Sequence, residues 1–175
     1  MTVEILSVSG TDLIPGKFLK RWQINRERPD EIVNIKKAAS LTTKEQAKLH
    51  VLQIDGRDIG FVTVDIHQLP KVNPGKYYLQ VAFLFVSKQY RKVNLDALEG
   101  LTASEYLMST VFNKAMDAAS FFPFSNIVLY PADEKLIPFY TSIGYSMLAR
   151  TKGFMFLPLR TEAVNLPASF VSTRS

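Results

Sequence analysis

Two short segments of the chain carry the residue types that could do chemistry. Within residues 139–145, a helical pattern carries Tyr140, ends at Gly144 and is followed by a strand pattern. Within residues 86–91, a strand pattern runs into a polar, basic turn. A tyrosine hydroxyl can donate a hydrogen bond or a proton, and basic side chains suit an anionic partner. These two segments are therefore the first candidates for functional residues.

The N-terminal elements follow from hydrophobic spacing and from helix-start residues. A weak alternation of apolar residues predicts a first strand at 2–8. Residues 18–24 have the pattern of a short helix, with Trp22 expected in the core. A second helix is predicted to open at Pro29, because proline suits the first helical turn and the two acidic residues after it suit the positive end of the helix dipole.

A hairpin and a long strand form the predicted centre of a sheet. Asp55-Gly56 between two apolar runs is the strongest short hairpin signal, and it joins predicted strands at 49–54 and 59–66. Residues 77–86 predict a long strand, whose apolar run from Val81 onward is typical of a strand buried on both faces. These strands must hold the basic turn that follows them.

A long helix and three strands are predicted after the basic turn. Helical spacing predicts the helix at 103–119, with Thr102 or Ser104 as its N-terminal cap. The predicted strands of this half lie at 127–130, 145–149 and 154–159.

The helix that carries Tyr140 is predicted at 133–142. Gly144 is expected to end it, because glycine readily takes the left-handed conformation that terminates helices. Pro138 lies inside this helix and is expected to kink it next to the tyrosine, since proline removes a backbone N–H.

The order of elements predicts an α/β (α+β) fold with a mixed, mostly antiparallel twisted sheet flanked by helices. Both hairpins must be antiparallel, and the central strand, helix and strand are most simply a parallel unit. Residues 1–160 are expected to form a single domain. Residues 161–175 are polar, lack periodicity and are expected to be a loosely held tail.

Composition and simple motifs exclude several classes of function. The chain has 175 residues and no cysteine, which excludes disulfides, thiolate metal sites and a cysteine nucleophile. No metal-ligand spacing, phosphate-binding P-loop, nucleophile elbow or RNA-binding signature is present. No apolar run reaches the roughly 20 residues that span a bilayer, and no signal peptide pattern opens the chain. A cytoplasmic protein without membrane contact or metal is therefore expected.

Over residues 45–160, the order of elements and the local motifs resemble the GNAT N-acetyltransferase superfamily. In that family, the strand before the long helix ends in Val-x-x-x-x-Arg/Gln-x-x-Gly-x-Gly/Ala. Val86 and Arg91 match this pattern, whereas Asn94 and Asp96 stand at the two glycine positions. A second alignment, with a loop about seven residues longer, places Gly100 and then Thr102 or Ala103 at those positions. Both alignments stay open at this point.

The resemblance implies a site for acetyl-coenzyme A as co-substrate. The backbone of Phe85 and Val86 would contact the acetyl and pantetheine groups and stabilise the oxyanion. The residues implied to receive the pyrophosphate are Arg91, Lys92, Asn94, Gly100, Thr102 and Ala103. Asp133 would lie near the pantetheine arm.

A second family pattern points to a catalytic tyrosine. In many GNAT proteins an Asn or Asp precedes a tyrosine by seven residues, and Gly-Phe/Tyr follows four residues later. Asp133, Tyr140 and Gly144-Tyr145 match this spacing. The resemblance implies that Tyr140 protonates the departing thiolate as a general acid. The structural alternative is that Tyr140 packs in the core and its hydroxyl only finds a hydrogen bond.

The resemblance implies an N-acetyltransferase that moves the acetyl group onto a primary amine by direct attack. No general base is identifiable, since His50 and His67 are lone histidines in or near the hairpin strands. The strand 153–159 and the segment from Ala132 to Tyr140 are also similar to toxin-type GNAT proteins. Those proteins acetylate aminoacyl-tRNA and pair with an antitoxin, and the net charge of +5 suits tRNA.

A different class of function stays open beside this one. If the glycine-poor loop no longer binds coenzyme A, the chain would be a non-catalytic GNAT-like binding module that uses its basic surface for a protein or nucleic-acid partner. The acceptor is not readable from the residues, and a homodimer stays open as an oligomeric state.

Overall fold

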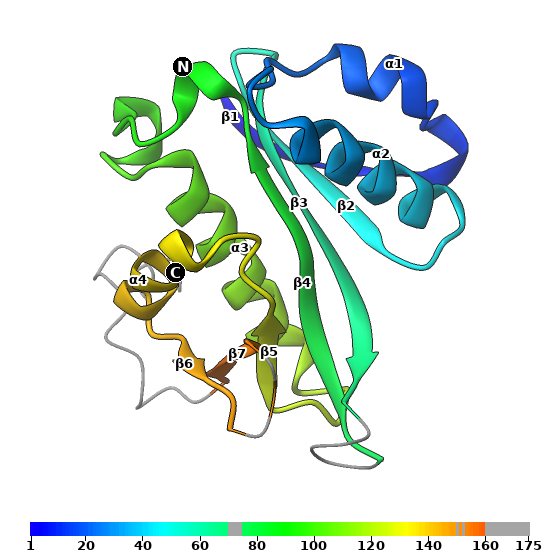
Figure 1. The fold of residues 1–175 in the computed structure, drawn as a ribbon, viewed down its shortest axis with the longest axis vertical. Coiled ribbons are helices and arrows are strands. Elements are labelled where there is room, and N and C mark those ends of the chain that lie inside the picture. The colour runs from blue at the N-terminus through cyan, green and yellow to red at the C-terminus, as the bar shows by residue number, and fades with distance from the viewer. Residues whose placement is uncertain (70–74, 150, 152, 160–175) are drawn as a thin grey trace. The chain divides into compact units, whose positions relative to one another are not determined.

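The computed structural model describes residues 1–69, 75–149, 151 and 153–159, and these residues form two compact units (Figure 1). Unit 1 contains Met1–Asp65 and Ala82–Met108, and unit 2 contains Ile66–Val81 and Ser109–Ser175. The predicted tail at 161–175 lies outside the described residues.

The described strands form one sheet in the order β1-β2-β3-β4-β5-β7-β6. The strands are β1 (Val3–Val8), β2 (Lys48–Ile54), β3 (Arg57–Gln68), β4 (Tyr77–Val86), β5 (Asn126–Leu129), β6 (Ser146–Met147) and β7 (Met155–Pro158). The α-helices are α1 (Pro15–Lys20), α2 (Pro29–Thr43), α3 (Ala103–Ala118) and α4 (Ile137–Ser142). Short 3-10 turns lie at Gly10–Asp12, Lys88–Tyr90, Asp96–Leu98 and Glu134–Leu136. The predicted fold class, a mixed and mostly antiparallel sheet flanked by helices, is confirmed.

Unit 1 is built on the antiparallel strands β1, β2 and β3. The predicted hairpin joins β2 to β3, and Asp55 and Gly56 take φ angles of 48° and 72°. Positive φ at both central residues is the conformation that Asn-Gly and Asp-Gly turns favour in hairpins. The helices α1 and α2 lie side by side along these strands, drawn in blue in Figure 1.

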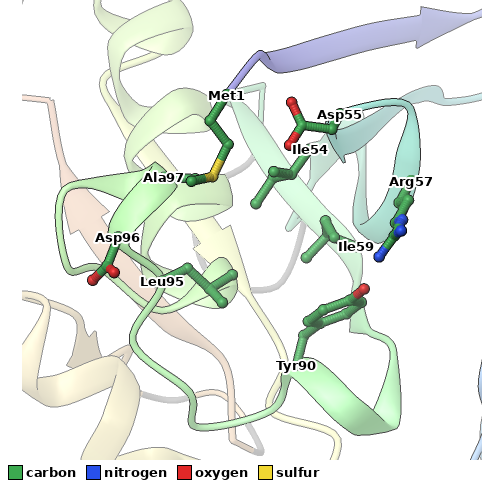
Figure 2. A pocket seen from close by; sticks show the side chains of 9 residues that line it. All are labelled: Met1, Ile54, Asp55, Arg57, Ile59, Tyr90, Leu95, Asp96 and Ala97. Atoms are coloured by element: carbon green, nitrogen blue, oxygen red, sulfur yellow. The ribbon is translucent and has the colours of Figure 1, made fainter.

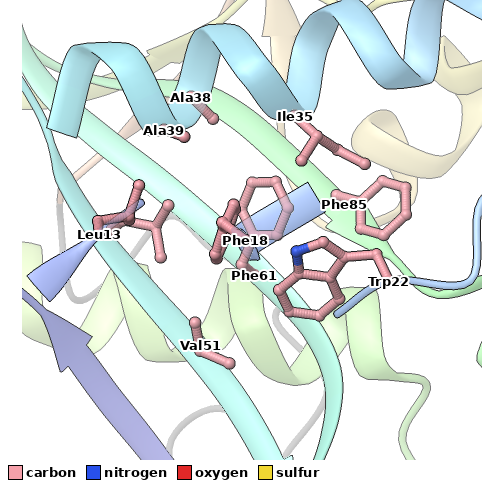
Figure 3. Close-up of a cluster of buried hydrophobic side chains, with 10 residues drawn as sticks. Leu13, Phe18, Trp22, Ile35, Ala38, Ala39, Val51, Phe61 and Phe85 are labelled. Atoms are coloured by element: carbon pink, nitrogen blue, oxygen red, sulfur yellow. The ribbon is translucent and has the colours of Figure 1, made fainter. Parts of the chain in front are cut away.

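The core of unit 1 is an aromatic cluster between these helices and the strands. Figure 3 shows the rings of Phe18, Trp22, Phe61 and Phe85 meeting beneath α2. Neighbouring ring centroids lie 5.2–5.7 Å apart, in edge-to-face, tilted and stacked arrangements. Aromatic pairs at this spacing add stability beyond the area they bury. The prediction that Trp22 is a core residue is confirmed.

Unit 2 contains the parallel pair that the sequence predicts. Leu79 of β4 pairs with Ile127 of β5 in parallel register, and β7 pairs antiparallel with both β5 and β6. A smaller core forms around Leu69, Tyr78 and Val128. Among the described residues, no helix is both long and apolar enough to cross a membrane.

Four local predictions differ from the structure. The short helix begins at Pro15 and ends at Lys20, instead of covering 18–24, because proline suits the first turn. Only part of the apolar run of β4 is buried, since three of its residues, Ala82–Leu84, are half buried. The two last strands are shorter than predicted.

Pro138 does not kink a helix. The segment 133–142 forms a 3-10 turn followed by α4, and Pro138 lies in the first turn of α4. In that turn the missing backbone N–H has no helical partner to lose, so proline is accepted without distortion.

Candidate functional site

The end of β4 is held by buried side chains and by the backbone of β3. The rings of Phe85 and Phe61 stack with centroids 5.5 Å apart, and Val86 is buried. The backbone N–H of Ser87 donates to the carbonyl oxygen of Ile59 at 2.9 Å. The backbone predicted to contact an acyl group is therefore fixed in place.

Gly60 of β3 lets the two strands approach closely at this point. A Cβ added to Gly60 would lie 2.6 Å from the carbonyl oxygen of Phe85 and 3.3 Å from the Cα of Val86. The β2–β3 register also shifts between Leu52 and Gln53, as at a β-bulge. The sequence analysis missed Gly60, although a lone glycine inside a strand pattern is a signal of close backbone approach.

Arg91 is bound inside unit 1. Its two terminal nitrogens donate to the two carboxylate oxygens of Glu31 at 2.7 and 2.9 Å, and its Nε donates to the carbonyl oxygen of Val86 at 2.8 Å. Its guanidinium also lies 5.3 Å from the centroid of the Phe85 ring. Three of its five N–H donors are thus used by the protein itself.

Glu31, the partner of Arg91, is a buried carboxylate at the start of α2. Burial by itself favours its neutral form, but hydrogen bonds from Arg91 and from the backbone N–H of Asn25 outweigh this effect. The pKa of Glu31 is therefore lowered. The pair ties the beginning of α2 to the end of β4.

The loop between β4 and α3 closes on itself. Asn94 and Thr102 form an antiparallel bridge, and the backbone N–H groups of Leu98 and Gly100 both donate to the carbonyl oxygen of Leu95. Residues 95–101 therefore form a compact loop that Asn94 and Thr102 close at its base. Asn94 belongs to the first alignment and Thr102 to the second, so candidate glycine positions of both alignments lie side by side.

The backbone of this loop takes a positive φ at Lys92 and Glu99, of 57° and 56°, and not at Asn94, which stands at a glycine position of the first alignment. Gly100 does have a positive φ, of 80°.

A capping box closes the N-terminus of α3. One carboxylate oxygen of Glu105 accepts hydrogen bonds from the backbone N–H and the hydroxyl of Thr102, at 2.8 and 2.7 Å. The backbone N–H of Glu105 donates in return to the Thr102 hydroxyl at 3.3 Å. Thr102 is thus the cap, and an acidic side chain lies beside the N–H that the second alignment offered to a phosphate. Ala103, the other residue offered there, is fully buried.

In unit 2, a turn at each end of α4 positions the tyrosine segment. The Asp133 carboxylate accepts from the backbone N–H of Lys135 at 2.9 Å and caps the 3-10 turn. After α4, the N–H of Tyr145 donates to the carbonyl oxygen of Tyr140 and the N–H of Gly144 to that of Thr141, each at 3.0 Å. With a φ of 97° at Gly144, this is a Schellman motif, and the predicted C-terminal glycine is confirmed.

Tyr140 is buried between two other rings. Only 7% of the residue is exposed, and its ring lies edge-to-face with Phe139 and with Tyr145 at centroid distances of 5.1 and 5.9 Å. Burial raises the pKa of Tyr140 to about 12. The hydroxyl is therefore protonated at neutral pH and can donate a proton or a hydrogen bond.

The two histidines have structural contacts. The ring of His67 stacks on Phe154 with centroids 6.2 Å apart, and the Nδ1 of His50 shares a hydrogen bond with the Ser7 hydroxyl at 3.0 Å. Neither contact identifies a general base.

Comparisons with known proteins give a structural answer only. No protein-family model matches the chain, and no curated protein matches it in sequence. Solved structures do match. The AtaTR complex with AcCoA has a TM-score of 0.70 and 12% identity, covering 90% of this chain and 93% of that one. AtaT complexed with acetyl-methionyl-tRNAfMet has a TM-score of 0.65 and 14% identity, covering 90% and 95%.

A third structure holds a mutant of the toxin AtaT bound to the C-terminus of the antitoxin AtaR. It has a TM-score of 0.68 and 12% identity, covering 91% of this chain and 93% of that one. The chain has the GNAT fold. The predicted fold is thereby confirmed, and at this level of identity the likeness establishes the fold alone.

Unit 1 contains a pocket of about 410 Å³ (Figure 2). Its lining comes from the N-terminus, the β2–β3 turn and the loop after β4: Met1, Ile54, Asp55, Arg57, Ile59, Tyr90, Leu95, Asp96 and Ala97. None of the residues predicted to hold coenzyme A lines it. Among the described residues, no group of three potential metal ligands is found.

Proposed function

We propose that the chain is an acetyl-coenzyme A-dependent N-acetyltransferase, with residues 1–160 acting as its single catalytic domain. The observation that carries this proposal is the buried, protonated hydroxyl of Tyr140. Tyr140 lies in the middle of α4, with Asp133 and Gly144-Tyr145 at the family spacing. Support comes from the GNAT fold, which this chain shares with a structure bound to AcCoA.

The proposed reaction is direct attack of a primary amine on the thioester carbonyl carbon. A C–N bond forms, and the tetrahedral intermediate then collapses with cleavage of the C–S bond. The sulfur takes the bonding electron pair and accepts the proton of the Tyr140 hydroxyl, while the attacking nitrogen loses a proton to solvent. A backbone N–H at the end of β4 would stabilise the oxyanion, which is worth a few kcal/mol in acyl transfer.

The end of β4 and the loop after it would bind different parts of the cofactor. Two half-buried apolar residues of β4, Ala82 and Leu84, share one face of the strand and offer a surface that a pantetheine arm could cover, whereas Phe83 packs against the aromatic cluster. Lys92, Asn94 and Gly100 are exposed on the following loop and would receive the pyrophosphate. Arg91 would act indirectly, because its bond to the Val86 carbonyl oxygen holds the end of β4.

A charged tRNA is the acceptor that we propose to test first. AtaT, similar to this chain over 90% of its length, has been solved with acetyl-methionyl-tRNAfMet, and the formal charge of +5 suits an RNA partner. In that case the protein would act in the cytoplasm, and an antitoxin would be its protein partner, as AtaR is for AtaT.

The test is acetyl transfer with purified protein, acetyl-coenzyme A and two acceptors, methionyl-tRNA and a panel of small primary amines. Thiol release can be followed with a thiol reagent, because the chain has no cysteine to react. Acceptor-dependent thiol release supports the proposal. Absence of transfer to every acceptor, with saturable binding to RNA or protein, would support the binding module instead.

A further inference from the structure

Tyr145 is a buried residue whose hydroxyl has no hydrogen bond to any residue that the structure describes. Only 2% of Tyr145 is exposed, and its hydroxyl oxygen is fully covered. A buried hydroxyl without a partner costs about 1–3 kcal/mol, and phenylalanine would fill the same space without that cost. The hydroxyl therefore calls for an explanation other than packing.

The ring of Tyr145 packs against that of Tyr140. The Schellman motif joins the two residues directly, since the N–H of Tyr145 donates to the carbonyl oxygen of Tyr140. Their ring planes meet at 65° with centroids 5.9 Å apart. Burial raises the pKa of Tyr145, and the charge that a Tyr140 phenolate would carry raises it further.

The proposed reaction creates a need that this hydroxyl could meet. A thiol has a pKa of about 8.5, whereas burial raises the pKa of Tyr140 to about 12. Transfer of the Tyr140 proton to a departing thiolate is therefore unfavourable, because it leaves a phenolate in an apolar site. A hydrogen-bond donor to that phenolate oxygen would reduce the mismatch.

We propose that Tyr145 is a positioning residue that donates its O–H to the Tyr140 oxygen as Tyr140 gives its proton to the departing sulfur. This inference rests on the proposed acetyl transfer. Tyr145 keeps its own proton throughout, and the phenolate of Tyr140 is reprotonated from solvent after the product thiol has formed. The raised pKa of Tyr145 suits this role, because the hydroxyl stays protonated.

The experiment is a double-mutant cycle in the thiol-release assay, with Tyr145→Phe, Tyr140→Phe and the double variant. Tyr145→Phe is expected to lower kcat about tenfold to a hundredfold, the range for a hydrogen bond to a charged group, with an unchanged KM for acetyl-coenzyme A. In the Tyr140→Phe background, Tyr145→Phe should have no further effect. Tyr78→Phe, at another buried tyrosine of unit 2, is the matched control and should keep full kcat.

Three results would overturn the inference. If Tyr145→Phe keeps full kcat, the Tyr145 hydroxyl has no role in the reaction. The same follows for its role toward Tyr140 if Tyr145→Phe lowers kcat equally with and without the Tyr140 hydroxyl. Both leave acetyl transfer by the wild type intact, so only the inference fails. A wild type that transfers to no acceptor removes the proposed function and the inference with it. Melting temperatures separate these cases from misfolding, because Tyr145→Phe should unfold no lower than the wild type.

Discussion

Two segments of the chain match patterns of one family: the loop between β4 and α3, and the segment around α4. They differ in whether the chain itself supplies hydrogen-bond partners for their polar groups. In the loop, Arg91 is bound by Glu31 and by the Val86 carbonyl oxygen, and the N–H of Thr102 is bound by Glu105. Around α4, the Tyr145 hydroxyl is buried without a hydrogen-bond partner among the described residues, and its ring lies edge-to-face with that of Tyr140.

The difference shows which part of the motif is built for stability and which for chemistry. A polar group that the chain itself satisfies contributes to the fold and is costly to redirect toward a ligand. A buried polar group that the chain leaves unsatisfied reduces stability, so each such group calls for a structural or a functional explanation. On this basis we propose that the loop is a scaffold with a few exposed ligands and that α4 carries the reactive group.

The largest expected effect is at Tyr140. Tyr140→Phe should lower kcat about 10²–10⁴-fold, the usual contribution of a general acid, with little change in the KM for acetyl-coenzyme A. Thiol release measures both constants. Tyr130→Phe is the control, since Tyr130 is 58% exposed in the same unit. Full turnover in Tyr140→Phe would contradict a chemical role for the segment around α4.

The next effect should be on stability, at the ion pair of the loop. Glu31→Gln should lower the free energy of unfolding by about 3 kcal/mol, because it leaves Arg91 without its buried counter-charge. Urea unfolding gives this value. Asp30→Asn, one residue away in an exposed pair with Arg28, should change it by less than about 1 kcal/mol. Equal values for the two variants would contradict a scaffold role for Arg91.

Alkaline pH should act on the tyrosine segment. An unfolded tyrosine titrates near pH 10, whereas burial raises the pKa of Tyr140 to about 12, so the unfolded state loses its proton first. The contribution of Tyr140 to stability should thus be constant below about pH 10 and fall as the pH rises toward about 12. Tyr140→Phe should make this fall shallower in urea titrations at several pH values, and an unchanged slope would show that Tyr140 is not buried in solution.

Gly60 tests whether the end of β4 is fixed by close packing. Gly60→Ala places a Cβ 2.6 Å from the carbonyl oxygen of Phe85. We therefore expect this variant to lower the free energy of unfolding by about 1–3 kcal/mol and to bind acetyl-coenzyme A more weakly. Gly16→Ala is the control, because its Cβ meets nothing within 4 Å and alanine favours the helix α1. Thermal unfolding and calorimetric titration measure the two effects. A Gly60→Ala variant as stable as Gly16→Ala would contradict this account.

The smallest effect concerns the charge at the start of α3. Glu105→Gln keeps the capping hydrogen bond but removes a negative charge from the helix N-terminus. We expect the affinity for acetyl-coenzyme A to rise about twofold to fivefold, with the gain lost at high salt. A lower affinity at low salt would show that the carboxylate helps the cofactor.

Sequence predicts those parts of the fold that local residues determine. The Asp55-Gly56 hairpin, the long helix α3 and the glycine stop at Gly144 are local signals, and the structure has all three. The Thr102-x-x-Glu105 capping box is also local, so it could have decided for Thr102 over Ser104 as the predicted cap.

Features that depend on distant residues could not be predicted in the same way. The pairing of Arg91 with Glu31 joins residues 60 positions apart, so Arg91 looked like a free cation. The burial of the Tyr145 hydroxyl was equally hidden, because tyrosine serves in cores and on surfaces alike.

Calorimetric titration of the protein with acetyl-coenzyme A tests the central claim most directly. If the chain is an enzyme that uses acetyl-coenzyme A, we expect it to bind the cofactor with micromolar affinity. Lys92→Glu should weaken this binding, because Lys92 is an exposed loop residue that would contact the pyrophosphate. Lys37→Glu, an exposed lysine on α2, should leave the affinity unchanged. The absence of binding at millimolar acetyl-coenzyme A would contradict the account and leave a GNAT fold that serves as a binding module.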